Sequence, residues 1–287
     1  MHAVPFLLAL ALAALLAPAL LRTLQQAGQT RPNFRERELA FPFGVLVLAA
    51  ALLALIPLML FARLASSDLF HPEFVPVVLY APGVLALGLI DDTLAPKGPL
   101  AGSAAGGARP VRGWRGHGAA LLRGEISTGV LKAAGSLGLA LLAMSYLNLS
   151  EARWLLAAGV LVLATNVFNL LDLRPGRSLK ALVLLGAGLT IGSSETRPLW
   201  TLGLFLAPAL VAGAYDLRER AMLGDTGANL LGALAGLWIV LTLSGPGQLV
   251  ALALLAAITV YGELRSISTL VERTPGLREL DSWGRPS

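Results

Sequence analysis

The chain has 287 residues, of which 56% are hydrophobic and 14% are charged. Soluble domains carry about 25% charged residues, so this composition excludes an ordinary soluble protein and indicates an integral membrane protein. The sequence has no cysteine, which excludes disulfides, thiolate metal sites and a cysteine nucleophile. Its net charge of +5 is more simply explained by membrane topology or a phosphate substrate than by nucleic acid.

Nine apolar runs have about the length that a helix needs to cross a bilayer. Together they predict one all-α, polytopic membrane domain over residues 1–287, with nine or ten transmembrane helices. The first run lacks a preceding basic segment, so we interpret it as a transmembrane helix rather than a signal peptide. The runs cover residues 3–21, 41–62, 74–90, 128–148, 153–171, 179–193, 198–214, 226–243 and 247–265.

The distribution of basic residues predicts how these helices are oriented. Of the 22 Lys and Arg residues, only Arg63, Arg153 and Arg197 fall on one side of the predicted bundle. The positive-inside rule makes the other side cytoplasmic, which places the N-terminus outside and the C-terminus inside. That side carries a basic, Gly/Ala-rich loop at 91–127 and a tail at 266–287. Apolar residues spaced three apart in the tail indicate a short helix on the membrane surface.

Asp91 and Asp92 directly follow the third run, at its cytoplasmic end. Adjacent carboxylates repel each other unless they share a cation or a proton, so this pair favours a divalent metal, or one ligand beside one base. No histidine pair has metal-binding spacing, so the ligands must be oxygens, which indicates Mg²⁺ or, as an alternative, Mn²⁺. The other interpretation is a solvated pair of helix-end carboxylates that binds Lys97.

Asn166, Asn169 and Asp172 end the fifth run at intervals of three residues. This spacing keeps them roughly on one face of a helix. A polar stripe on an apolar helix must face protein or water rather than lipid. Asparagines also form hydrogen bonds between membrane helices without any further function, but the terminal Asp172 makes a functional site the favoured interpretation.

Asp225 lies in the segment Gly224-Asp225-Thr226-Gly227, which opens the eighth run. The flanking glycines permit the close approach of a phosphate or a ligand to the helix N-terminus. The alternative is that Asp225 is simply the N-cap of its helix, because a carboxylate is favourable there.

Several basic residues on the same side could neutralise phosphates. Each of them could equally be a determinant of topology. They are Arg112, Arg115, His117, Arg123 and Lys132.

Asp216 lies close to Arg218 and Arg220, which favours a solvated, ion-paired loop carboxylate. With Asp225 it also resembles the YD and GxGD motifs of intramembrane aspartyl proteases. Those two aspartates must come from different helices, whereas Asp216 and Asp225 are predicted to lie in one loop.

In order along the chain, four segments resemble motifs of the polyprenyl-phosphate N-acetylhexosamine-1-phosphate transferase superfamily, which includes the phospho-MurNAc-pentapeptide translocase. The resemblance covers roughly residues 20–285, and the last two motifs are the most specific. The segments are NFRERELAFPFG (33–44), GLIDDTLAPKG (88–98), NVFNLLD (166–172) and MLGDTGANLLGALAG (222–236).

This resemblance implies a Mg²⁺-dependent enzyme of the bacterial inner membrane with its active site on the cytoplasmic face. It would transfer a sugar-1-phosphate from a UDP-amino sugar to undecaprenyl phosphate and release UMP, in cell-wall or peptidoglycan biosynthesis. The implied partners are the polyprenyl phosphate, the nucleotide-sugar donor and the bilayer, with a homodimer left open. The implied residues are Asp91, Asp92, Asn169 and Asp172 for catalysis, Asp225 for the metal, and Asn166, Lys132, Arg115, His117, Gly224 and Gly227 for substrate binding.

The chain departs from that family where NxxNxxD normally continues as DGLDGLA, because Pro175 stands in place of the second aspartate. This departure favours an alternative, a non-catalytic member that binds the lipid carrier or scaffolds envelope assembly. The retained carboxylates favour the enzyme. A secondary transporter would show inverted repeats and broken helices, and the sequence indicates neither.

Overall fold

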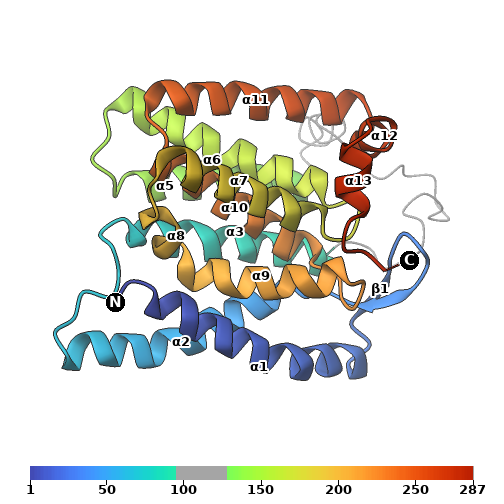
Figure 1. Ribbon diagram of the computed structural model, residues 1–287, viewed down its shortest axis with the longest axis horizontal. Helices are drawn as coiled ribbons and strands as arrows, with labels where there is room; N and C mark the ends of the chain where they lie inside the picture. The colour runs from blue at the N-terminus through green and yellow to red at the C-terminus, as the bar shows by residue number, and fades with distance from the viewer. Residues whose placement is uncertain (95–127, 287) are drawn as a thin grey trace.

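The computed structural model describes residues 1–94 and 128–286, and it is a helical bundle with a small β-hairpin at one end (Figure 1). A helix coincides with each of the nine predicted runs. The first six of these are α1 (Val4–Gln26), α2 (Val45–Leu64), α3 (Phe74–Leu94), α5 (Thr128–Met144), α6 (Glu151–Leu171) and α7 (Arg177–Ser193). The others are α8 and α9 (Arg197–Thr201 and Gly203–Leu217), α10 (Gly224–Thr242) and α11 (Gly245–Leu264).

Six helices in the described part of the chain are long and apolar enough to span a membrane, namely α1, α2, α3, α6, α10 and α11. The prediction of a mostly helical, multi-pass membrane protein is therefore confirmed, with the β-hairpin as an exception to the all-α prediction. Several predicted boundaries differ by a few residues, the first helix among them, which ends at Gln26 rather than 21. The seventh run is divided at Leu202 into α8 and α9. The second helix starts at Val45 rather than 41, because the backbone N–H groups of Phe43 and Gly44 bind the segment before α10 instead.

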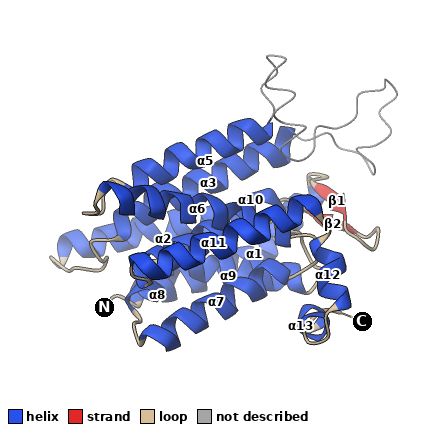
Figure 2. Ribbon diagram, turned by 90° about the horizontal axis from the view of Figure 1, so that it is seen from above, coloured by secondary structure: helices blue, strands red, loops and turns tan. Residues whose placement is uncertain are grey.

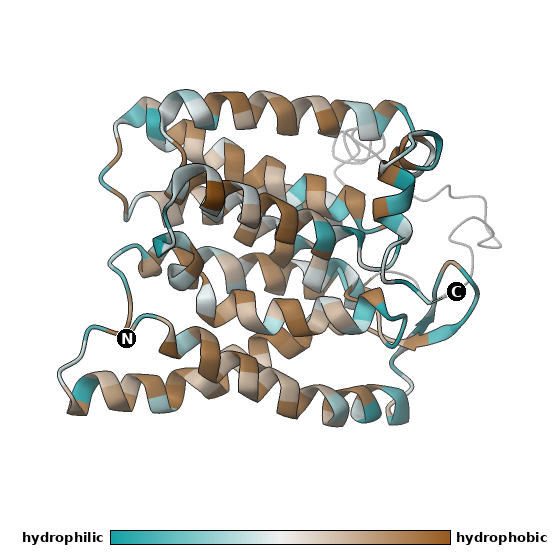
Figure 3. Cartoon of the chain, in the orientation of Figure 1, coloured by the Kyte–Doolittle hydropathy of each residue, from teal (hydrophilic) through white to brown (hydrophobic). Residues whose placement is uncertain are grey.

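The centre of the bundle is α10, in which every residue from Thr226 to Val240 is buried. Small residues on α10 let its neighbours approach closely. A Cβ atom on Gly232, for example, would lie 2.6 Å from the Cα atom of Thr165 on α6. By contrast, 17% of the apolar window of α11 is buried, against 83% for α10, so most apolar side chains of α11 are exposed on the outside of the bundle. Figure 3 shows the hydropathy along the helices, with apolar helix bodies and more polar helix ends.

A hairpin of β1 (Thr30–Pro32) and β2 (Glu38–Ala40) lies at the same end of the bundle as the C-terminal helices (Figure 2). It is bound to the segment that precedes α10. The N–H of Met222 donates to the carbonyl of Ala40 at 2.9 Å, and the N–H of Phe43 donates to the carbonyl of Met222 at 2.8 Å. The hairpin therefore fixes the position at which α10 begins.

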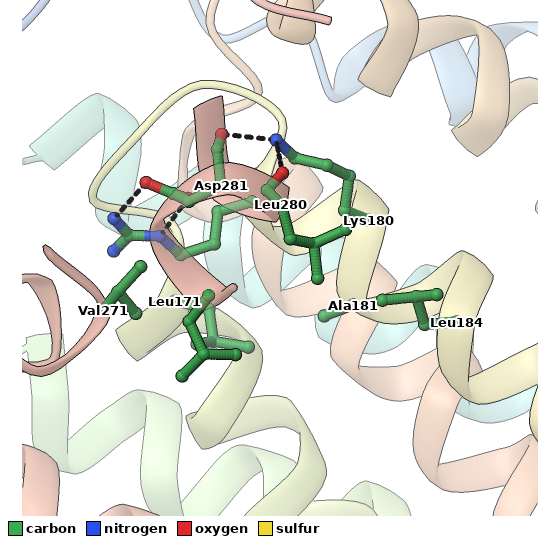
Figure 4. Close-up of a pocket in the computed structure, with 9 residues that line it drawn as sticks. Leu171, Lys180, Ala181, Leu184, Val271, Leu280 and Asp281 are labelled. Carbon is green, nitrogen blue, oxygen red and sulfur yellow. Dashed lines mark hydrogen bonds and ion pairs between the residues drawn. The ribbon is translucent and has the colours of Figure 1, made fainter. Parts of the chain in front are cut away.

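The C-terminal segment forms α12 (Ile267–Arg273) and α13 (Leu277–Ser282), and it folds back onto α7. Arg177 donates to both carboxylate oxygens of Asp281, at 2.8 and 3.0 Å, and the Lys180 ammonium donates to three backbone carbonyls of the tail. The sequence predicts a short helix of the tail on the membrane surface. In the structure, the tail helices are held against α7 by these contacts. A cavity of about 170 Å³ lies beneath it, lined by Leu171, Ala181, Leu184, Val271, Leu277 and Leu280 together with these charged groups (Figure 4).

Candidate functional site

Four helices bring a lysine, two carboxylates and an amide together at the end of the bundle that carries the hairpin. Lys132 of α5 donates a hydrogen bond to Asp91 Oδ2 of α3 at 3.3 Å and another to Asp225 Oδ2 of α10. The side chains of Asp91 and Asp225 are 23% and 32% exposed, so a ligand from solution can reach both. Residues separated by more than 90 positions in the sequence therefore share one ammonium group.

Asn169 of α6 completes this group. The Lys132 ammonium can only donate hydrogen bonds and the Asp225 carboxylate can only accept them, which fixes the orientation of the amide between them. In that orientation the Asn169 nitrogen donates to Asp225 Oδ1 at 3.1 Å, and its oxygen accepts from Lys132 Nζ at 3.2 Å. Asp91, Lys132, Asn169 and Asp225 are called the central cluster below.

Asp92 has a different position from its neighbour Asp91. Its carboxylate is buried and accepts three hydrogen bonds from the first turn of α10: from the N–H of Asp225 at 3.0 Å, from the N–H of Thr226 at 2.8 Å and from the Thr226 hydroxyl at 2.6 Å. The N-cap position of α10 is occupied by Leu223, whose side chain cannot accept a hydrogen bond. Asp92 therefore caps α10 from another helix.

This cap corrects two interpretations of the sequence. Asp225 is not the N-cap of α10, because Asp92 has that role, and the Asp225 carboxylate is directed to Lys132 instead. Asp91 and Asp92 are not a solvated pair either, because Asp92 is 7% exposed. In addition, Arg31 of the hairpin donates to the Asp92 carbonyl at 2.6 Å. Nothing in the sequence indicates this contact.

The predicted ligand-binding glycines are used for packing between helices. Gly224 has a positive φ of 70°, and a Cβ atom there would lie 2.6 Å from Asp92 Oδ2. Gly227 packs against Leu223 and Gly44. A Cβ atom on Gly88 of α3 would meet the Asp225 carbonyl and lie 2.8 Å from Thr226 Cα, so this glycine allows α3 to reach the start of α10.

Asp172, which is half-buried, and Asp216, which is buried, form a second group next to the central cluster. The Ser178 hydroxyl donates to Asp172 Oδ1 at 2.8 Å. Asp216 accepts from the N–H of Gly176 at 2.7 Å and from the N–H of Leu223 at 3.4 Å. Burial and the neighbouring Asp216 carboxylate raise the pKa of Asp172, and the Asp225 and Asp92 carboxylates raise it further.

The expectation of a solvated Asp216 was wrong, because its side chain is 6% exposed and connects the starts of α7 and α10. The nearby Arg220 lies over the Tyr215 ring rather than on Asp216. Asn166 also lies outside the central cluster. Its amide donates to Thr259 Oγ1 of α11 at 3.3 Å, which is the contact between helices that the sequence left open. Arg115, His117 and Lys97 lie outside the described residues.

The central cluster suits a hard divalent cation in the chemistry of its donors. Among residues 1–94 and 128–286, no three His, Cys, Asp or Glu side chains lie close enough to hold a metal by themselves. Mg²⁺, however, is usually held by one or two carboxylates and by substrate phosphates. Asp91 and Asp225 already share a cation, the Lys132 ammonium, so the position accepts positive charge.

Comparison with known proteins adds no family assignment, because no protein-family model and no curated protein matches this sequence. The geometry of the central cluster therefore carries the functional argument.

Proposed function

We propose that this chain is a phosphoglycosyl transferase that resembles the polyprenyl-phosphate N-acetylhexosamine-1-phosphate transferases. It transfers a sugar-1-phosphate from a UDP-amino sugar to undecaprenyl phosphate and releases UMP, in cell-envelope glycan biosynthesis. It resides in the bacterial inner membrane with nine spanning helices, an outer N-terminus and a cytoplasmic C-terminus. The three basic residues Arg63, Arg153 and Arg197 lie at the ends of α2, α6 and α8 away from the hairpin, which supports this orientation.

The observation that carries the proposal is the convergence of Asp91, Asn169 and Asp225 on the Lys132 ammonium. Three of these residues belong to the motifs that suggested the family. Side chains of this kind are costly at a membrane boundary unless they pair with one another or with a substrate. Their partial exposure at the polar end of the bundle makes them accessible to an anionic donor from the cytoplasm.

The reaction requires that several negative charges be held together. An oxygen of the lipid phosphate attacks the β-phosphorus of the donor, the bond from this phosphorus to the bridging oxygen breaks, and UMP leaves. Asp91 takes the proton from the acceptor phosphate. Lys132 neutralises phosphate oxygens, and electrostatic stabilisation of this kind supplies most of the catalysis in phosphoryl transfer.

Asp225, with the Asn169 amide beside it, would hold Mg²⁺, which when bound neutralises the diphosphate and the leaving group. Asp92 holds the Asp225 backbone in place through its three hydrogen bonds to α10. Asp172 and Asp216 form the floor of the site, where Asp172 binds α7 and Asp216 connects the starts of α7 and α10.

The test uses purified protein with undecaprenyl phosphate, Mg²⁺ and a panel of UDP-sugars, and measures UMP release. We expect release with at least one amino-sugar donor and its loss in the Asp225→Ala variant. Absence of UMP release with every donor, together with intact binding of the lipid carrier, would refute the proposed transferase activity. That result would support the non-catalytic alternative favoured by Pro175.

A further inference from the structure

The Lys132 ammonium is surrounded by three oxygens from three different helices. These are Asp91 Oδ2 at 3.3 Å, Asp225 Oδ2, and the Asn169 amide oxygen at 3.2 Å. Carboxylate and amide oxygens are also the ligands that Mg²⁺ and Mn²⁺ prefer. The ammonium therefore lies at the point where these oxygens would bind a divalent cation.

A bound ammonium and a divalent cation cannot share these oxygens at hydrogen-bond distance. The two positive charges would repel each other strongly in a site that is largely removed from water, since the Lys132 side chain is 18% exposed. Without any cation, on the other hand, the Asp91 and Asp225 carboxylates would repel each other. A cation or a shared proton must therefore offset this repulsion, and the ammonium and a divalent cation compete for the same oxygens.

Lys132 is able to leave without a change in the helices. It belongs to the first turns of α5 (Thr128–Met144), and its four-carbon side chain is flexible, so the ammonium can move while the backbone stays in place. When a nucleotide-sugar donor is bound, the displaced Lys132 ammonium can form an ion pair with the diphosphate of that donor.

We propose that Lys132 is an exchangeable counter-ion. It holds Asp91 and Asp225 together when no divalent cation is bound, and it is displaced when one binds, which frees its ammonium for an anionic phosphate. This inference rests on the proposed function for the identity of the cation as a cofactor. A lysine that served only as a fixed phosphate contact would not respond to the metal.

The first experiment measures Mn²⁺ binding to the purified full chain by electron paramagnetic resonance, without donor or acceptor. Lys132→Met removes the competing charge and keeps most of the side-chain volume, so we expect Mn²⁺ to bind about ten-fold more tightly than in the wild type. Lys180→Met is the matched control, because Lys180 binds the C-terminal tail, and it should leave Mn²⁺ affinity unchanged. Equal or weaker binding in Lys132→Met would overturn the proposal.

The second experiment tests the displacement itself in the wild-type protein. The sequence has three lysines, Lys97, Lys132 and Lys180, so acetylation by a water-soluble reagent can be followed at each by peptide mass spectrometry. Mn²⁺ should accelerate acetylation of Lys132 several-fold and leave Lys180 unaffected. Protection of Lys132 by Mn²⁺, or no change, would contradict the exchange. Neither experiment needs turnover, so absence of UMP release would refute the proposed function alone.

Discussion

Asp92 provides a sharp test of how the site is held, because its carboxylate caps a helix that starts with a functional residue. Replacing Asp92 with alanine removes the acceptor of three hydrogen bonds from the first turn of α10. The N–H of Thr226 and its hydroxyl then remain buried without a partner. We expect the start of α10 to loosen and Asp225 to lose its fixed position beside Lys132.

The size of the effect follows from the groups that lose their partner. Each buried donor left without an acceptor costs about 1–3 kcal/mol, and loss of an N-cap costs about 0.5–2 kcal/mol. These contributions overlap, and removal of a buried charge returns part of its desolvation energy. We therefore expect the free energy of unfolding to fall by about 2–5 kcal/mol in Asp92→Ala.

The assay is unfolding of the purified protein in detergent, followed by tryptophan fluorescence. Asp91→Ala is the matched control, because Asp91 is partly exposed and bound to Lys132 at 3.3 Å. Its loss leaves Lys132 bound to Asp225 and Asn169 and leaves the cap of α10 in place, so it should lower the free energy of unfolding by clearly less than Asp92→Ala does. If Asp91→Ala were as destabilising as Asp92→Ala, or if Asp92→Ala unfolded like the wild type, the cap would not hold α10 in place.

Three further predictions concern other positions. Gly88→Ala should lower both stability and turnover, because its Cβ would lie 2.8 Å from Thr226 Cα. Gly138→Ala is the control, because a Cβ there meets nothing within 4 Å, and it should behave like the wild type. Equal melting temperatures for the two variants would contradict this. Partial burial raises the pKa of Asp281, but hydrogen bonds from Arg177 lower this pKa overall. The contribution of the Asp281 carboxylate to tail docking is therefore lost as pH falls through this lowered pKa, below about pH 4. A tail that resists proteolysis equally at neutral and acid pH would contradict this prediction. Burial and the Asp216 carboxylate raise the pKa of Asp172, so ionisation of Asp172 at higher pH destabilises the folded state. Asp172→Asn should therefore raise the melting temperature at alkaline but not at acid pH. The same change in melting temperature at both pH values would refute this reasoning.

The helices could be predicted from the sequence because length and apolarity alone specify a membrane helix. Side-chain directions at the helix ends were harder to predict. Asn166 and Asp172 are six residues apart, and at 3.6 residues per turn this places them about 120° apart. Asn166 accordingly contacts α11, while Asn169, between them, reaches Asp225 on α10.

The division of roles between Asp91 and Asp92 could not be predicted, because it depends on contacts between distant segments. A cap normally comes from the residue that precedes its helix, and the sequence therefore suggested Asp225 for α10. Asp92 takes this role only because Gly88 lets α3 approach α10. Asp216 was misjudged for a similar reason, since its partners are backbone N–H groups of two other segments.

The most direct test of the central claim is to follow the phosphate itself. A UDP-amino sugar labelled with ³²P at the β-phosphate is incubated with the protein, Mg²⁺ and undecaprenyl phosphate, and the lipid is then extracted. Transfer of a sugar-1-phosphate at the central cluster predicts labelled lipid in the wild type and none in Asp225→Asn. Label that stays in the aqueous nucleotide fraction with every donor, or that enters the lipid equally in Asp225→Asn, would contradict the claim.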